Sequence, residues 1–258
     1  MRKYLFSLTI MLLAVLSISA QGVPEEVAAS SASHPASIVA STSWTAAFAD
    51  LGGLDDVAFI APANLTHPPE YEITVSDVVK INHADYFIFA GYERMMQSMG
   101  DSIKKEEGTM LQITTTNDIE NVKKQAATIA SITGTEEKSK ERLASYIATI
   151  EEGAKQAEDR GLTEAKVYCH AMQVYLAEDL GLQVAGTFGP GPVTAQQISE
   201  VSKGGYHIII DNIHNPIAGP LMEVSPDTKL VVWRNFPESG GRGSLESMVQ
   251  ANIEALLQ

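Results

Sequence analysis

The middle of the chain constrains the fold most, because residues 118–159 show helical periodicity throughout and contain no strand candidate. The pattern is interrupted once, at Gly134 and Thr135, where glycine can end one helix and threonine can cap the next. The second helix, from Glu136 to about Asp159, would be on the order of 35 Å long. A helix of this length suits a strut that joins two lobes.

Short apolar segments alternate with helical segments before this region. Strands are expected at 37–40, 57–61 and 86–90, and helices at 45–51 and 76–82. The third strand is apolar at every position, as is typical of a strand that is covered on both faces. Alternation of strands and helices at this spacing indicates a parallel sheet.

A second series of the same kind follows the long helix. Its expected strands are 166–169, 184–187, 207–210 and 229–233, and its expected helices are 172–180, one opened by Thr194, and 245–257. Thr194 and Gln197 have the spacing of a capping box. We therefore predict an α/β fold with two lobes, each with a parallel sheet flanked by helices, joined by a long rigid helix.

The amino terminus predicts export. Arg2 and Lys3 precede an apolar run from Leu5 to Val15, and small residues follow at 17–20. This order is typical of a secretory signal peptide over residues 1–20. We expect the protein in the periplasm or on the extracellular face of the cytoplasmic membrane. Cleavage of the signal and its retention as an anchor both stay open.

The rest of the chain divides into four parts. Residues 21–36 are small and polar and predict a flexible leader. The patterns beyond it predict an N-terminal α/β lobe at 37–117, a helical region with the strut at 118–160, and a C-terminal α/β lobe at 161–258.

Composition limits the classes of function. The chain has 18 Lys and Arg against 32 Asp and Glu, a formal net charge of -14. So acidic a chain is a poor partner for nucleic acid, whose phosphates need basic side chains. Hydrophobic residues make up 45% of the chain, enough to bury real cores. Its single cysteine, Cys169, cannot make an intramolecular disulfide.

Four segments carry a resemblance to a known family. After His67 the chain reads Glu70-Tyr-Glu-Ile-Thr-Val-Ser-Asp77, and Ala84-Asp-Tyr-Phe-Ile-Phe-Ala-Gly91 follows. Farther on, His170-Ala-Met-Gln-Val-Tyr-Leu176 precedes Gly181-Leu182. In their order and in their residues these segments resemble the TroA-like (cluster A-I) solute-binding proteins of zinc and manganese ABC importers.

The resemblance implies capture of a divalent transition metal ion, Zn²⁺ first and Mn²⁺ next, in the cleft between the lobes. It implies an extracytoplasmic protein that delivers this ion to the permease of an ABC importer, so the ion is a transported ligand. It also implies a monomer without catalytic activity.

Two ligand positions of that family hold other residues here. The position of its second histidine corresponds to Thr114, and the position of its late aspartate falls near Asn235. His67 also stands two residues farther from the segment that begins at Glu70 than is usual in the family. The usual set of four ligands is therefore incomplete.

A second pair of candidates follows the expected strand 207–210. Asp211 and His214 leave its carboxyl end, which faces the ligand crevice in open α/β folds. Imidazole and carboxylate groups are good ligands for Zn²⁺ and Mn²⁺. The predicted metal site consists of His67, His170, His214 and Asp211, with Asn235 and Glu238 in reserve.

Each candidate has a structural alternative. His170 could cap its helix, Asp211 and His214 could stabilise the turn before Pro216, and His67 could be an ordinary loop histidine. Cys169 should face away from His170, because neighbouring residues of a strand point to opposite sides. Three methionines at helical spacing favour core packing over copper binding: Met95, Met96 and Met99.

Two other functions stay open. The first is a relative with an altered site that binds a metal chelate or a small organic ligand, suggested by Thr114 and Asn235. The second is a metal-dependent hydrolase, for which the chain offers neither a His-Glu-x-x-His nor a Gly-x-Ser-x-Gly motif. Binding is favoured over catalysis.

Overall fold

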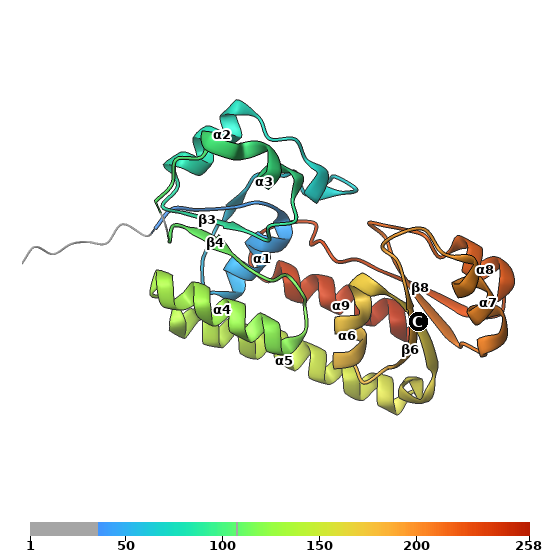
Figure 1. Cartoon of the computed structure of the whole chain (residues 1–258). Helices are drawn as coiled ribbons and strands as arrows, with labels where there is room; N and C mark the ends of the chain where they lie inside the picture. Colours follow the sequence, from blue (N-terminus) through green and yellow to red (C-terminus); the bar gives the residue numbers. More distant parts are fainter. Residues whose placement is uncertain (1–35, 107) are drawn as a thin grey trace, which may run out of the picture. The chain divides into compact units, whose positions relative to one another are not determined.

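The structure is a computed structural model that describes residues 36–106 and 108–258 (Figure 1). The expected signal peptide, 1–20, and all but the last residue of the expected leader, 21–36, lie outside the described residues. Within the described ranges, no helix is both long enough and apolar enough to cross a membrane.

The first lobe contains a parallel sheet of four strands in the order β2-β1-β3-β4. Its strands are β1 (Ile38–Ala40), β2 (Ala58–Phe59), β3 (Tyr86–Phe89) and β4 (Met110–Gln112). Its helices are α1 (Ser43–Leu51), α2 (Val75–His83) and α3 (Arg94–Met99), with short 3-10 turns at Pro68–Glu70 and Gly100–Ser102.

The second lobe repeats this plan, with strand order β6-β5-β7-β8 and all neighbours parallel. Its strands are β5 (Lys166–His170), β6 (Gln183–Phe188), β7 (Ile208–Asn212) and β8 (Lys229–Trp233). Its helices are α6 (Val174–Asp179), α7 (Ala195–Gly204), α8 (Gly219–Val224) and α9 (Ser244–Leu257), with 3-10 turns at Leu162–Glu164 and Ala171–Gln173. The predicted α/β fold with two parallel sheets is confirmed.

Two consecutive helices connect the lobes: α4 (Ile119–Thr133) and α5 (Glu136–Asp159). Gly134 ends α4 in the left-handed conformation, φ 68°, as the sequence predicts. Thr135 precedes α5 but does not cap it, because its hydroxyl donates to the carbonyl of Gly52 instead. Figure 1 shows α5 running beside α4, and α5 also packs against α9.

One hydrophobic core continues through both lobes. It includes Trp44 and Phe48 of α1, Ile150 of α5, and Trp233 and Val249 from the second lobe, all of them buried. Two smaller clusters lie apart from it, one in each lobe. Helix α5 is therefore part of a shared core and contacts α1 of the first lobe as well as α6 and α9 of the second.

The structure departs from the sequence-based expectations at several short elements. The elements α3, β4 and α8 were not expected, and each spans six residues or fewer. Helix α2 is capped by Thr74 instead of Ser76, because Asp77 stands three residues after Thr74 and completes a capping box. The expected strand 57–61 is reduced to Ala58–Phe59.

Candidate functional site

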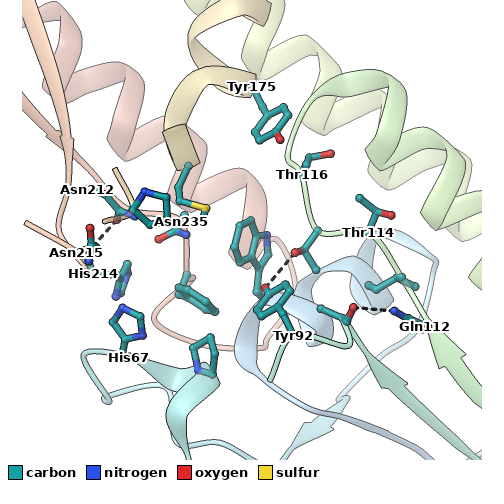
Figure 2. A pocket seen from close by; sticks show the side chains of 18 residues that line it. His67, Tyr92, Gln112, Thr114, Thr116, Tyr175, Asn212, His214, Asn215 and Asn235 are labelled. Atoms are coloured by element: carbon teal, nitrogen blue, oxygen red, sulfur yellow. Dashed lines mark hydrogen bonds between the residues drawn. The ribbon is translucent and has the colours of Figure 1, made fainter. Parts of the chain in front are cut away.

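A cavity of about 810 Å³ opens at the carboxyl ends of both sheets, where ligands bind in open α/β folds. Both lobes line it: Ala90 and Tyr92 follow β3, Ile113 follows β4, and Asn235 follows β8. Figure 2 shows these walls, with His67 and His214 close together on one side. The cavity is therefore the place where side chains of the two lobes meet.

His67 reaches the cavity from the loop between β2 and the turn at Pro68–Glu70. Its side chain is 44% exposed, and its Nδ1 atom lies 3.8 Å from Oε1 of Glu70. An accessible imidazole at the rim of a cavity is able to exchange water for a metal ion.

His214 comes from the second lobe, in the segment after β7, and contacts the first lobe directly. Its Nδ1 atom lies 3.0 Å from the carbonyl oxygen of Thr66, the residue before His67. Because a carbonyl only accepts, Nδ1 carries the proton and Nε2 of the neutral ring holds a lone pair. Nε2 is buried and has no hydrogen-bond partner among the described residues.

The protonation of His214 suits a ligand. Burial lowers the pKa of its imidazole, and the backbone groups of Thr66 and Phe236 oppose this shift only in part. The ring is thus neutral at pH 7, as a metal-binding imidazole must be. The ring edge of His214 also meets Phe236, with ring centroids 5.2 Å apart.

His170 is placed differently. It is fully buried, its Nδ1 accepts the backbone N–H of Met172 at 3.1 Å, and its Nε2 lies 3.1 Å from Oδ1 of Asn215. Because Nδ1 accepts, Nε2 carries the proton and donates it to Asn215. Neither nitrogen has a free lone pair, so His170 caps the turn after β5, the alternative open at the sequence level.

Asp211 is also committed to backbone groups. Its Oδ1 accepts the N–H of Asn212 at 2.8 Å and its Oδ2 accepts that of Ala218 at 3.0 Å. The carboxylate is 5% exposed and is not part of the cavity wall. It stabilises the turn after β7 that carries His214.

The four predicted ligands therefore do not meet in the structure. Within residues 36–106 and 108–258, no group of three or more His, Cys, Asp and Glu side chains could hold a metal ion. The cavity brings together His67 and His214, while His170 and Asp211 hold the surrounding backbone.

Of the two reserve candidates, one lines the cavity and the other does not. Asn235 lines the cavity, is 4% exposed, and has a buried Oδ1 without a partner in the described part of the chain. Glu238 is 80% exposed and pairs with Arg234 at 2.8 Å, outside the cavity wall. Thr114, at the position of the family's second histidine, also lines the cavity.

Sequence reasoning did not identify the aromatic part of the wall, which consists of Trp44, Tyr92, Tyr175 and Phe236. Tyr92 directly follows the turn at Gly91, and Tyr175 lies in the helix that follows His170. The turn is held by the buried carboxylate of Glu93, which accepts the N–H groups of Ala90 and Gly91. For two of these residues the sequence held a signal, since Tyr92 directly follows the segment 84–91 and Tyr175 lies within the segment 170–176.

The sulfur-containing side chains that were considered as metal ligands lie in the hydrophobic cores. Met95 and Met99 are buried in the core under the first sheet, where the helical spacing predicts them. Cys169 is buried, and this burial raises the pKa of its thiol, so that the thiol stays protonated.

No family model matches the chain, and no curated protein matches it either. Solved structures do match. They include the SBP (solute-binding protein) FpvC from Pseudomonas aeruginosa in complex with Mn²⁺, at 16% identity and a TM-score of 0.69, covering 87% of this chain and 98% of FpvC.

Two further solved structures are similar. The Mn-bound periplasmic metal-binding protein from Candidatus Liberibacter asiaticus has 15% identity and a TM-score of 0.59, over 85% of this chain and 97% of that one. The laminin-binding protein Lbp of Streptococcus pyogenes has 17% identity and a TM-score of 0.63, and the match covers 87% of this chain and 98% of Lbp. At these identities the similarity establishes a shared fold, which is the fold the sequence resemblance implies.

Proposed function

We propose that the protein is an extracytoplasmic solute-binding protein that captures a divalent transition metal ion in the cavity between its lobes. One observation carries the proposal: His67 and His214, from different lobes, line the same cavity, and Nε2 of His214 is buried without a hydrogen-bond partner in the described part of the chain. A buried lone pair on a neutral imidazole costs free energy unless it gains a donor or a cation. A metal ion would supply that partner.

The chemistry of the wall supports zinc before manganese. The strongest donors on the cavity wall are two imidazoles, and Asn235, which has an unpartnered amide oxygen among the described residues, lines the same cavity. Within the described residues the wall contains no Asp or Glu side chain. Imidazole suits Zn²⁺, whereas Mn²⁺ is favoured by carboxylates.

The proposed partner is the permease of an ABC importer, and the proposed location is the periplasm or the outer face of the cytoplasmic membrane. The solved structures of similar fold include periplasmic metal-binding proteins with Mn and Cd bound. Capture and release would need no chemical step, so the protein would act without turnover. We also propose that it acts as a monomer.

Titration of the untagged chain with Zn²⁺, Mn²⁺ and Ni²⁺ tests the proposal. We expect one ion per chain, with Zn²⁺ bound more tightly than Mn²⁺. His67→Ala and His214→Ala should each weaken Zn²⁺ binding by about tenfold or more, about 1.4 kcal/mol, because each removes a direct ligand.

His83→Ala is the matched control, since His83 ends α2 and lies outside the cavity wall. The Zn²⁺ affinity of the His83→Ala variant should equal that of the unchanged protein. Zn²⁺ uptake that survives both cavity variants, or no uptake by the unchanged chain, would remove the basis of the proposal.

A further inference from the structure

The cavity is far larger than a bare metal ion requires. Its volume is about 810 Å³, within the range of roughly 300–1,000 Å³ that small organic ligands occupy. A site for an ion alone would close tightly around a few donor atoms. The size of this cavity is unexplained if the ion is its whole content.

The wall also offers too few donors for an ion alone. A closed zinc site has four ligands, and the wall provides the imidazoles of His67 and His214, with the Asn235 amide oxygen as a weaker third. No Asp, Glu, Lys or Arg is among the described residues of the wall. Two imidazoles and an amide oxygen therefore compensate only in part for the hydration that a dication loses on entry. A guest that brings donors and negative charge would supply the rest.

The rest of the wall suits a flat apolar guest. Tyr92 of the first lobe is 48% exposed, and Met172 and Tyr175 of the second lobe are each 38% exposed. Figure 2 shows Tyr175 at the top of the view and Tyr92 at the bottom, with His67 and His214 on the left. Aromatic faces favour stacking on other aromatic rings.

Trp44 also lines the cavity and carries a buried polar group. Its indole packs edge-on against Phe236, with ring centroids 4.9 Å apart, and both residues line the cavity. Its Nε1–H is buried and has no acceptor among the described residues. Because an indole N–H can only donate, only an acceptor that reaches this buried atom, such as a guest oxygen, would satisfy it.

We propose that the cargo is a divalent metal ion already held by a small aromatic chelator, with coordination positions left open for His67 and His214. The chelator supplies further donors and the charge that neutralises the ion, and its ring packs against Tyr175. This inference rests on the proposed function, and it names the form in which the ion arrives.

Two matched zinc complexes test it. Dipicolinate and iminodiacetate both bind Zn²⁺ through one nitrogen and two carboxylates and give neutral complexes, but only dipicolinate contains an aromatic ring. We expect zinc dipicolinate to bind at least tenfold more tightly than Zn²⁺ alone and more tightly than zinc iminodiacetate. Tyr175→Ala should reduce the preference for dipicolinate over iminodiacetate at least fivefold, and His214→Ala should weaken both complexes.

The outcomes separate the inference from the function beneath it. If Zn²⁺ alone binds as tightly as either complex and His67→Ala and His214→Ala both weaken it, the chelator is excluded and metal capture stands. Equal binding of zinc dipicolinate and zinc iminodiacetate would exclude the proposed contact between an aromatic ring of the chelator and the cavity wall. Binding of metal-free dipicolinate as tight as that of its zinc complex, unaffected by the histidine variants, would overturn both proposals.

Discussion

At the scale of single residues, the backbone decides which histidines can bind a metal. His214 donates from Nδ1 to the carbonyl of Thr66 and keeps a lone pair on Nε2. His170 accepts the N–H of Met172 and donates to Asn215, and these two hydrogen bonds occupy both nitrogens of the His170 ring. Both histidines lie at the carboxyl end of a strand, but only His214 keeps a nitrogen lone pair with which it can bind a metal ion.

His170→Ala tests this difference. The substitution removes a fully buried ring together with its two hydrogen bonds, to the N–H of Met172 and to Oδ1 of Asn215, so the free energy of unfolding should fall by about 2 kcal/mol. The rise in melting temperature on adding Zn²⁺ should equal that of the unchanged protein. Thermal unfolding with and without Zn²⁺ measures both. Loss of the Zn²⁺ effect with unchanged stability would instead identify His170 as a ligand.

The residues of the cavity were only partly predictable. His67 follows from its motif and His214 from its place after a strand, and both line the cavity. The sequence also places His170 and Asp211 at strand ends, but it cannot show that backbone N–H groups occupy them. Hydrogen bonds of this kind depend on the local path of the chain, which spacing alone does not determine.

At the scale of elements, ion pairs attach the loop after α1 to helix α5. The carboxylate of Asp55 pairs with Lys138 at 2.5 Å and also with Arg142, and Arg142 reaches Asp50 of α1 at 2.8 Å. The hydrogen bonds from Lys138 and Arg142 lower the pKa of Asp55 to about 2 from 3.8. These bonds connect the first lobe to the strut.

The stability from Asp55 should depend on pH in a defined window. Because its pKa is lower in the folded state, its contribution is present above pH 3.8 and is lost as the pH falls toward 2. The side chain is half exposed, so Asp55→Asn should lower the free energy of unfolding at pH 7 by less than about 1 kcal/mol. Urea unfolding at pH 7 and near pH 2.5 measures the difference.

The neighbouring variant Asp56→Asn is the control for this prediction. Asp56 is exposed and makes no ion pair among the described residues, so its substitution should have little effect at either pH. An Asp55→Asn effect that stays the same at both pH values would contradict the assigned ion pairs.

Long periodic elements were predictable, and short elements were not. The limits of α5 agree with the periodicity, since its helix runs from Glu136 to Asp159 as expected. Strand β4 was missed because Met110–Gln112 is too short to show an alternating pattern, and pairing with β3 defines it. The same holds for α3, whose six residues contain less than two helical turns.

At the scale of the whole described chain, the lobes are fastened at several points. The hydroxyl of Ser43 donates to the carbonyl of Pro237 at 2.8 Å, and the N–H of Gly243 donates to Asp50 at the same distance. The continuous core along α1, α5 and α9 adds apolar contacts. Such fastening opposes wide hinge motion.

We therefore expect only small lobe movements on binding. The shared core would have to open for a wide closure, which costs buried apolar contacts. Small-angle scattering of the chain with and without Zn²⁺ should give the same radius of gyration within error. A large compaction on metal addition would show that the helix does not act as a rigid strut.

The plan of lobe, strut and lobe could be predicted because it depends on the order of long elements. The volume and wall of the cavity could not, since they depend on how Tyr92, Tyr175 and Trp44 pack across the two lobes. Periodicity shows that a residue is apolar. It does not show whether that residue fills a core or faces an open cavity.

The central claim is that one metal ion is held by an imidazole from each lobe. Crystals of the protein loaded with zinc, measured at the zinc absorption edge, test it most directly. We expect one anomalous peak in the cavity, about 2.0–2.1 Å from a nitrogen of His67 and from Nε2 of His214. A peak at His170 and Asp211, or none in the cavity, would contradict it.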